Sequence, residues 1–462
     1  MADHLGGTAA EYDVLVDFAE LKNGNYTAWQ QLINLASAGL NNAAYQKAQG
    51  RNPDGSPNPA FPVLLHAESL IDYMILHIFH GADDWPNHNW WAGRATRNST
   101  GINDGFHFFA WDQEISNVNV LYERSSWQSA PAKYADVNAA NTPAQIYYSL
   151  RQNSPEFRLQ FADRVQRHLF NGGALSPAAI TARWNARVAE IDHAIVAESA
   201  RWGDYQPNLA RPGQPYRREV EWQAHLSWMA ANFWPAIGPV ALQRFRAAGL
   251  YPSVNPPALN QHGGSYLPAF TATLTNPNAG GTIHYTLNGS DPRLAGGTAN
   301  PAATVYIAPF ALTGSPVIKA RVLQSGTWSA LTETTFTPEP DWDHDGIPND
   351  WETAHGLDPD TAADALLDPD QDGTNNLSEY AANTDPQDRN SRFTATPMVN
   401  AAGRQLRFTA QPGRHYRLEA SDQLSGWSTI TDRPAVSVTT ETDWLIPPGE
   451  TRRFYRIVAG VD

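Results

Sequence analysis

The chain of 462 residues carries a formal net charge of −15, contains no cysteine and is 17% charged and 11% aromatic, with 16 tryptophans. This composition is typical of a soluble globular protein, and the length favours about two to four domains. The negative charge argues against nucleic acid and anionic membrane surfaces as partners, because both require a positive field, and it favours divalent cations. The lack of cysteine excludes disulfides and thiolate metal ligands, and no apolar run approaches the roughly 20 residues that span a bilayer.

The first 68 residues are expected to form a lead-in to the first domain. An amphipathic helix is predicted over Tyr26–Ala38, and the Pro and Gly content of Gly50–Pro62 indicates a loop. The opening sequence MADHLGGTAAEYD is polar and does not have the form of a signal peptide. If the protein is exported, we therefore expect its export signal upstream of these residues.

The most informative stretch lies between residues 69 and 112. Apolar residues recur at helical spacing over Ser69–His80, and Gly81 is expected to end that helix. Two strand-like runs, 90–94 and 106–111, come next and are separated by polar turn residues. The pattern predicts a helix followed by a loop and a β-hairpin.

Three polar side chains fall on this frame. Asp84 and Asn89 follow the helix with the spacing D-x-x-x-x-N, and Asp112 follows the second strand. In protein kinases this spacing joins the base that accepts the substrate hydroxyl proton to an amide that holds a metal ion, and a later aspartate holds magnesium. We therefore predict a catalytic role for Asp84 and a role for Asn89 and Asp112 in holding the metal and nucleotide.

The segments LIDYMILHIFHGADDWPNHNWW and FHFFAWDQEIS, with YDVLVDFAELKNGNYTAWQQL upstream, resemble the CotH (spore coat protein H) kinases, a family of atypical secreted or surface-associated protein kinases. The resemblance covers about the first half of the chain. It implies that Asp84 is the catalytic aspartate, and that Asn89 and Asp112 bind the Mg²⁺ or Mn²⁺ that accompanies ATP. The family's amino-terminal lobe should precede these residues and carry a nucleotide-binding lysine. Lys22 and Lys47 are the only lysines there and neither lies in a strand-like context, so we expect most of that lobe to be missing.

Other interpretations of this stretch remain open. Asp and Asn are common in loops because their side chains bond nearby backbone, so the first domain can be a degenerate scaffold without catalysis. His77, His80 and His88 lie close enough in sequence to suggest a zinc cluster. No fourth ligand is evident, however, and solvated or capping histidines are the simpler interpretation.

Three helical regions are predicted after the hairpin. The first begins at Ser154–Pro155 and the second at Ser176–Pro177, because Ser favours the cap position and Pro the first helical position. The second carries an apolar stripe from Ile180 to Ile195 that is expected to be core. The third, Arg218–Gly249, is expected to be interrupted by its internal prolines.

Residues 254–338, here called the strand-rich segment, contain short β-rich runs separated by Gly, Asn and Pro, with a hairpin-type Asn-Gly pair at 288–289. The pattern predicts a small β-sandwich. The sequences GTIHYTLNGSDPR and VIKARVLQSGTWS resemble the fibronectin type III-associated domain. Because that domain is usually an accessory, Asp291 and Arg293 in its turn are expected to be structural rather than catalytic.

Residues 341–352, the first acidic loop, and 368–379, the second acidic loop, both fit D-x-D-x-D-G-x-x-x-x-x-E. Calcium is a hard cation that takes six to eight oxygens, so carboxylates at alternate positions can wrap it and the Gly permits the sharp turn. Two calcium sites are predicted, with Ile347 and Thr374 donating backbone carbonyls. The predicted ligands are Asp341, Asp343, Asp345, Ile347, Asn349 and Glu352 in the first loop, and Asp368, Asp370, Asp372, Thr374 and Glu379 in the second. No good helix precedes the first loop, so the pair resembles thrombospondin type 3 and dockerin-like calcium repeats; a solvated acidic linker is the alternative.

The fold class expected for the whole chain is multidomain α+β. A mostly α, kinase-like carboxy-terminal lobe (1–253) precedes an Ig-like β-sandwich (254–338), a paired EF-hand-like calcium module (339–390) and a β domain (391–462). The predicted function is transfer of the ATP γ-phosphate to protein Ser or Thr by a secreted or surface, bacterial-type, calcium-binding protein. Its partners would be a protein substrate or another extracellular molecule. The alternative is a non-catalytic extracellular binding or structural protein stiffened by calcium, and a carbohydrate-directed enzyme is supported only by the accessory-domain resemblance.

Overall fold

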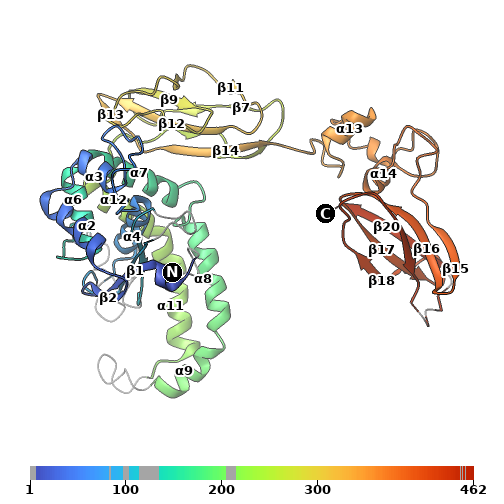
Figure 1. Cartoon of the computed structure of the whole chain (residues 1–462), viewed down its shortest axis with the longest axis horizontal. Helices are drawn as coiled ribbons and strands as arrows, with labels where there is room; N and C mark the ends of the chain where they lie inside the picture. The colour runs from blue at the N-terminus through green and yellow to red at the C-terminus, as the bar shows by residue number, and fades with distance from the viewer. Residues whose placement is uncertain are drawn as a thin grey trace. The chain divides into compact units, whose positions relative to one another are not determined.

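The structure is a computed structural model, and it describes residues 7–82, 85–96, 104–113, 135–203, 215–447, 449, 451–452 and 454–461. The chain divides into two compact units, Met1–Gly264 with Ala269–Thr337 and Ser265–Pro268 with Pro338–Asp462. Both units contain helices and strands (Figure 1), which confirms the multidomain α+β class. Among the described residues, no helix combines the length and the apolar composition that crossing a membrane requires. The finer division into four domains stays a prediction.

The first unit begins with an antiparallel sheet of order β2-β1-β3-β4. The predicted hairpin is present as β3 (Trp90–Ala95) and β4 (His107–Ala110), with ends that differ by one residue from the predicted runs. β1 (Tyr12–Val16) and β2 (Glu20–Asn23) lie within the expected lead-in, where the sequence pattern does not reveal them. β1 pairs on one side with β2, its neighbour in sequence, and on the other with β3, a strand distant in sequence, so the tertiary fold supplies its second partner.

Several helices pack with this sheet around one hydrophobic core (Figure 1). They are α2 (Thr27–Ala38), α3 (Asn42–Ala48), α4 (Ala67–His80), α6 (Pro143–Asn153) and α7 (Pro155–Leu169). The rings of Trp29 on α2 and Trp90 on β3 stack with centroids 5.6 Å apart, and both side chains are buried. The two tryptophans thus attach helix and sheet to each other near the end of the β3–β4 hairpin.

The starts of α4 and α7 follow the chemistry of helix caps. Ser154 Oγ accepts a hydrogen bond from the backbone N–H of Phe157 (3.1 Å), and Pro155 occupies the first helical position, as predicted. Helix α4 is capped by an imidazole instead: Nδ1 of His66 accepts from the backbone N–H of Ser69 at 3.0 Å. His66 is therefore tied to the helix that leads into the predicted catalytic loop.

The second predicted helical region differs from expectation. It breaks into α8 (Pro177–Ile191) and α9 (Ala194–Trp202), and the expected continuous buried stripe is wrong. Ile180 is the buried member of α8, whereas Ile191 is 43% exposed. The stripe is therefore core only in part: Ile180 is buried and Trp184 packs against the core, while the remaining stripe positions are half-buried or exposed.

The third helical region is continuous through its prolines. It consists of η2 (Arg218–Trp222), α11 (Gln223–Trp228), η3 (Met229–Phe233) and α12 (Trp234–Ala247), where η2 and η3 are π-helical. The predicted interruption is wrong: Pro235 lies just after the π-helical turn η3, and Pro239 is accommodated inside α12.

The strand-rich segment contains β5 (Ala258–Leu259), β6 (Gly264–Tyr266), β7 (Thr271–Ala272), β8 (Leu274–Thr275), β9 (Thr282–Thr286), β10 (Thr304–Val305), β11 (Phe310–Ala311), β12 (Val317–Gln324), β13 (Thr327–Trp328) and β14 (Thr332–Pro338). In its main sheet β10, β9, β12 and β14 are neighbours in that order. The segment is β-rich as expected, and β9 and β12 contribute Ile283, Ala320 and Val322 to a core of the segment's own.

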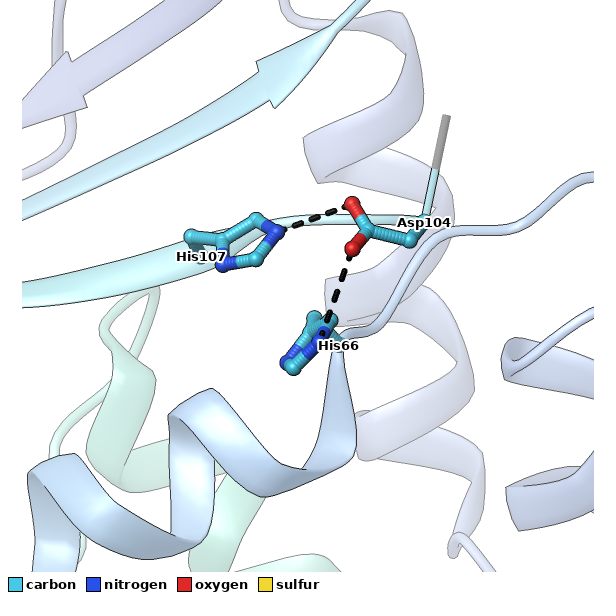
Figure 2. A group of neighbouring side chains, drawn as sticks. All are labelled: His66, Asp104 and His107. Carbon is cyan, nitrogen blue, oxygen red and sulfur yellow. Dashed lines mark hydrogen bonds and ion pairs between the residues drawn. The ribbon is translucent and has the colours of Figure 1, made fainter. Parts of the chain in front are cut away.

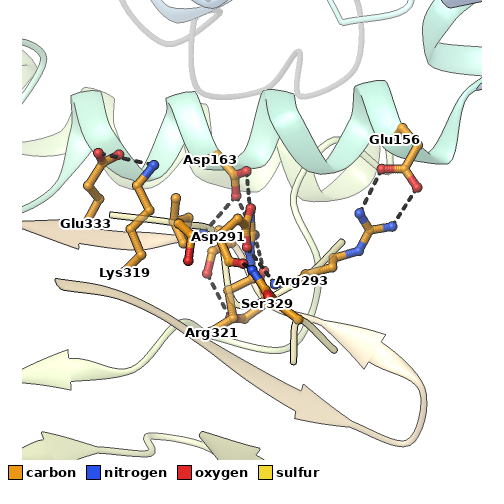
Figure 3. A network of polar contacts seen from close by, with 12 residues as sticks. Glu156, Asp163, Asp291, Arg293, Lys319, Arg321, Ser329 and Glu333 are labelled. Carbon is orange, nitrogen blue, oxygen red and sulfur yellow. Dashed lines mark hydrogen bonds and ion pairs between the residues drawn. The ribbon is translucent and has the colours of Figure 1, made fainter. Parts of the chain in front are cut away.

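Charged side chains join the strand-rich segment to α7 (Figure 3). Arg321 on β12 donates to both carboxylate oxygens of Asp163 at 2.7 Å and to those of Asp291 at 2.8 and 2.6 Å. Arg293 makes a two-pronged contact with Glu156, with both nitrogen–oxygen distances 2.7 Å. Asp291 and Arg293 thus serve the packing of the segment on the helix, which agrees with their expected structural role.

The second unit contains two short α-helices, α13 (Asn349–His355) and α14 (Asn376–Ala382), and the 3₁₀ turn η4 (Asp364–Leu366). Two three-stranded sheets, β15-β16-β19 and β18-β17-β20, follow and share one core that includes Phe408, Tyr416 and Trp444. Their strands are β15 (Thr396–Asn400), β16 (Gly403–Ala410), β17 (Arg414–Ser421), β18 (Ser428–Arg433), β19 (Thr440–Leu445) and β20 (Phe454–Val461). These strands agree with the β structure expected for residues 391–462.

Candidate functional site

The helix that leads to the predicted catalytic loop ends as the sequence indicates. Gly81 has a left-handed backbone (φ 67°), and its N–H donates to the carbonyl of His77 at 3.0 Å. Asp84, the predicted catalytic residue, lies outside the described residues, as does Asp83. The structure therefore gives the two ends of this loop, and the role of Asp84 stays a prediction.

The two predicted metal ligands lie at the same end of the β3–β4 hairpin. Trp90 is paired with Ala110, and the N–H of Trp111 donates to the carbonyl of Asn89 at 3.3 Å. Asn89 immediately precedes β3 and is buried, whereas Asp112 follows β4 by two positions and is exposed. The hairpin therefore brings the backbones of these two positions to one edge of the sheet.

Both positions also have an uncommon backbone. Asn89 and Asp112 adopt positive φ values of 66° and 51°, a region that side-chain-bearing residues rarely enter and that Asn and Asp tolerate best. Such residues are concentrated at ligand-binding and catalytic sites, although the same conformation also serves turns. The conformations of Asn89 and Asp112 therefore agree with a binding site at this edge of the sheet.

Two histidines lie on the last turns of α4, and the ring of His77 is 4.6 Å from that of Trp85. His77 and His80 are buried, and burial lowers their pKa to about 3 and about 4, so both rings are neutral at physiological pH. Nδ1 of His77 lies 2.9 Å from the carbonyl of Tyr73 and donates to it, which leaves Nε2 unprotonated. His88 is exposed, and its ring contacts Phe18 at 4.3 Å. The three rings therefore occupy two different environments and do not form the zinc cluster that their spacing in the sequence suggested.

A second constellation, absent from the sequence predictions, joins His66, Asp104 and His107 (Figure 2). One oxygen of Asp104 is 2.8 Å from Nε2 of His107 and the other is 3.5 Å from Nε2 of His66, and the two rings stack at 4.2 Å. Leu65 and Phe106 form a parallel bridge that holds the two segments together. His66 is distant in sequence from the other two residues, so no local spacing pattern could have found the group.

The hydrogen bonds of His66 decide what this group can do. Its Nδ1 accepts from the N–H of Ser69, so the neutral ring carries its proton on Nε2, toward Asp104. A metal ion on Nε2 would require that proton to leave, and the helix cap would have to break for Nδ1 to become the protonated nitrogen. Burial, followed by the charge of His107, lowers the pKa of His66. We interpret the group as a carboxylate bridging two imidazoles.

The two acidic loops have matching backbone turns. In the first, Asp341, Asp343 and Asp345 each accept a backbone N–H from within the loop, at 3.0, 3.3 and 2.7 Å. In the second, the equivalent bonds to Asp368, Asp370 and Asp372 are 2.9, 3.1 and 2.7 Å. Gly346 and Gly373 have φ values of 95° and 97°, which only glycine adopts readily. Each set of three aspartates offers ligand oxygens within 4.8 Å of one another.

The remaining carboxylate oxygens of these loops are buried without a hydrogen-bond partner in the part of the chain that the structure describes. They are Asp341 Oδ1, Asp343 Oδ2, Asp345 Oδ2, Glu352 Oε1 and Oε2, Asp370 Oδ2, Asp372 Oδ2 and Glu379 Oε2. A buried carboxylate costs free energy unless it is paired or binds a metal. Burial, with the neighbouring aspartates, raises the pKa of Glu352 and Glu379 to about 7. All-oxygen donor sets of this kind fit a hard divalent cation.

Two details modify the predicted ligand sets. The carboxamide of Asn349 is held by the loop backbone, since Oδ1 accepts from the N–H of Trp342 (2.8 Å) and Nδ2 donates to the carbonyl of Glu339 (3.0 Å). In the second loop, Nε of Arg392 lies 3.2 Å from Asp372 Oδ2. Asn349 thus has a structural partner on each side of its amide, and Asp372 has a cation beside one of its oxygens.

Comparison with known families agrees with this division of the chain. Residues 4–231 match the family model described as CotH kinase protein. The first half of the chain is thus similar to the CotH kinase family, which supports a kinase-like scaffold there. Residues 272–336 match the model described as Fn3 associated, which confirms the second resemblance. Neither match extends over the acidic loops, and no curated protein matches the chain.

Proposed function

We propose that the CotH kinase domain transfers the γ-phosphate of ATP to Ser or Thr of a protein substrate. Asp84 orients the acceptor hydroxyl and takes its proton. Asn89 and Asp112 hold Mg²⁺ or Mn²⁺, which neutralises charge on the phosphate oxygens when it is bound. Phosphoryl transfer depends almost entirely on positioning and charge stabilisation. A base for the acceptor hydroxyl and two metal ligands are therefore the groups that the reaction requires here.

One observation carries the proposal beyond family similarity. The β3–β4 hairpin bonds the backbone of Asn89 to Trp111, the neighbour of Asp112, and both predicted ligands adopt positive φ. An amide and a carboxylate oxygen held at one sheet edge are ligands suited to magnesium. The loop that carries Asp84 joins α4 to Asn89, so it starts and ends in ordered structure.

The test is transfer of radiolabelled phosphate from ATP, with Mg²⁺ or Mn²⁺, to the protein itself and to candidate acceptor proteins. Asp84→Asn is expected to abolish transfer, while Asp83→Asn, the matched control, retains most of it because only Asp84 has the kinase spacing to Asn89. Inert proteins under all of these conditions, or full activity in Asp84→Asn, would favour a non-catalytic scaffold.

We also propose that the acidic loops bind two calcium ions and that the protein works outside the cell or on its surface. The buried, unpartnered oxygens of Glu352 and Glu379 are the supporting observation. Extracellular calcium modules bind with dissociation constants of about 10⁻⁴–10⁻³ M, and bound calcium would relieve the repulsion among the aspartates. Calcium would then order this region of a surface protein, a role that stands whether or not the kinase domain is active. Calorimetric titration should show calcium heats that magnesium does not reproduce, because magnesium requires tighter octahedral geometry.

A further inference from the structure

A carboxylate from outside the twelve-residue pattern lies at the first acidic loop. Asp364 heads η4, in the connection between the loops, and its ligand oxygen lies within 4.8 Å of those of Asp345 and Glu352. Oδ2 of Asp364 accepts from the N–H of Asp358 (2.9 Å), while Oδ1 has no partner among the described residues. Asp364 is 9% exposed and Glu352 is fully buried. The carboxylates of Asp345, Glu352 and Asp364 thus lie close together, and each has at least one oxygen without a hydrogen-bond partner among the described residues.

We propose that Asp364 is a calcium ligand of the first site and takes the place that the sequence pattern gives to Asn349. The inference rests on the calcium binding proposed above. Asn349 is bonded on both sides of its carboxamide to the backbone of its own loop, whereas Asp364 presents a bare, buried oxygen to the other ligands. A buried carboxylate beside other carboxylates is strongly unfavourable without a cation, so its position is explained by a ligand role.

The extra ligand makes the two sites unequal. The first has five carboxylates (Asp341, Asp343, Asp345, Glu352 and Asp364), and the second has four (Asp368, Asp370, Asp372 and Glu379). In the second site Arg392 also offsets part of the charge of Asp372. Calcium affinity rises with the number of charged ligands, so the first site is the tighter one and fills first.

Asp364 also connects the first site to the second loop. Its backbone carbonyl accepts from Nδ2 of Asn376 at 2.8 Å, and the N–H of Asn376 donates to the carbonyl of Leu367 at 3.0 Å. Asn376 is fully buried at the start of α14, inside the second acidic loop. An ion that fixes Asp364 therefore also fixes η4 and the residue that orients the second loop. Calcium at the first site should pre-order the second and raise its affinity.

The test is calcium binding by the full chain, measured by calorimetry or equilibrium dialysis. The unmodified protein is expected to bind two ions. Asp364→Asn should weaken the tighter site at least about tenfold, since even the loss of a neighbour that orients a ligand costs ten- to a hundredfold. Asp360→Asn removes the same charge from an exposed position of the same connection and should leave both affinities unchanged. Retention of the weaker ion by Asp364→Asn shows that the variant is folded.

The outcomes separate the two proposals. No calcium binding by the unmodified protein ends the calcium proposal and this inference together. Two ions bound equally well by Asp364→Asn and the unmodified protein overturn the ligand role alone. If Asp364→Asn does not fold, the test is instead hydrogen–deuterium exchange on the Glu379→Gln protein, in which the second site is disabled. Calcium must then protect the amides of residues 358–367, and unchanged exchange there refutes the ligand role.

Discussion

The strongest stability prediction concerns Arg321, which fixes the strand-rich segment to α7 of the kinase-like domain. Its side chain is 2% exposed and donates to Asp163, to Asp291 and, at 2.9 Å, to the carbonyl of Ser329. Burial raises the pKa of the Asp163 carboxyl, and the neighbouring charge of Arg321 opposes that effect. The ionised form of Asp163 is therefore stabilised by Arg321. Arg321→Met keeps much of the apolar stem and removes only the charge and its hydrogen bonds.

The expected cost follows from the groups left behind. Removing one partner of a buried ion pair typically costs about 3–5 kcal/mol, because the remaining charge is buried and uncompensated. Here two carboxylates lose their common cation, so the loss should lie within that range or above it. Combining Arg321→Met with Asp163→Asn and Asp291→Asn should recover part of the loss, since the amides keep their acceptor oxygens without the buried charge.

The measurement is urea-induced unfolding followed by tryptophan fluorescence. Lys319→Met is the matched control, because Lys319 lies on the same strand and pairs with Glu333 at 3.4 Å near the surface, where such pairs contribute about 0–1 kcal/mol. Segment and domain should also unfold in one transition in the unmodified protein. A loss in Arg321→Met no larger than that in Lys319→Met would refute the buried contact and show that the segment is a loosely tethered accessory.

Two further predictions address the kinase domain itself. The pKa values of about 3 and 4 at His77 and His80 mean that the unfolded chain binds protons below about pH 6.5 while the folded chain does not, so stability is lost as pH falls. At pH 5 the loss should be about 2 kcal/mol per histidine, and a His77→Gln, His80→Gln protein should show a flatter pH profile in urea titrations. Gly105→Ala should lower the melting temperature clearly, because its Cβ would lie 2.5 Å from the Leu65 backbone nitrogen at a φ of +99°. Gly172→Ala, at a φ of +79° with open space around it, should cost only the backbone strain of about 1 kcal/mol, and equal losses in the two variants would contradict the crowding argument.

The sequence by itself determined the features whose causes are local. The cap at Ser154, the end of α4 at Gly81 and the strands of the β3–β4 hairpin depend on residues a few positions apart, and the structure has them. The same holds for the acidic loops, whose alternate aspartates and one glycine bend the chain without help from elsewhere. Family resemblance in the first half of the chain was also readable, because the motifs are contiguous.

Only the tertiary structure decided the features that join distant segments. β1 receives its second strand partner, β3, from a distant part of the chain, and Asp104 meets His66 because the Leu65–Phe106 bridge brings two segments together. Apolar spacing predicted a buried stripe on α8 that the fold buries only in part, since burial depends on which neighbour covers a helix. Asp364 reaches the first acidic loop through the turn of η4, and no residue pattern encodes that approach. Local hydrogen bonds and steric limits act within a few residues, so they can be inferred from the sequence. Pairing of distant strands, burial of a helix face and the approach of distant charged groups depend on how the whole chain packs.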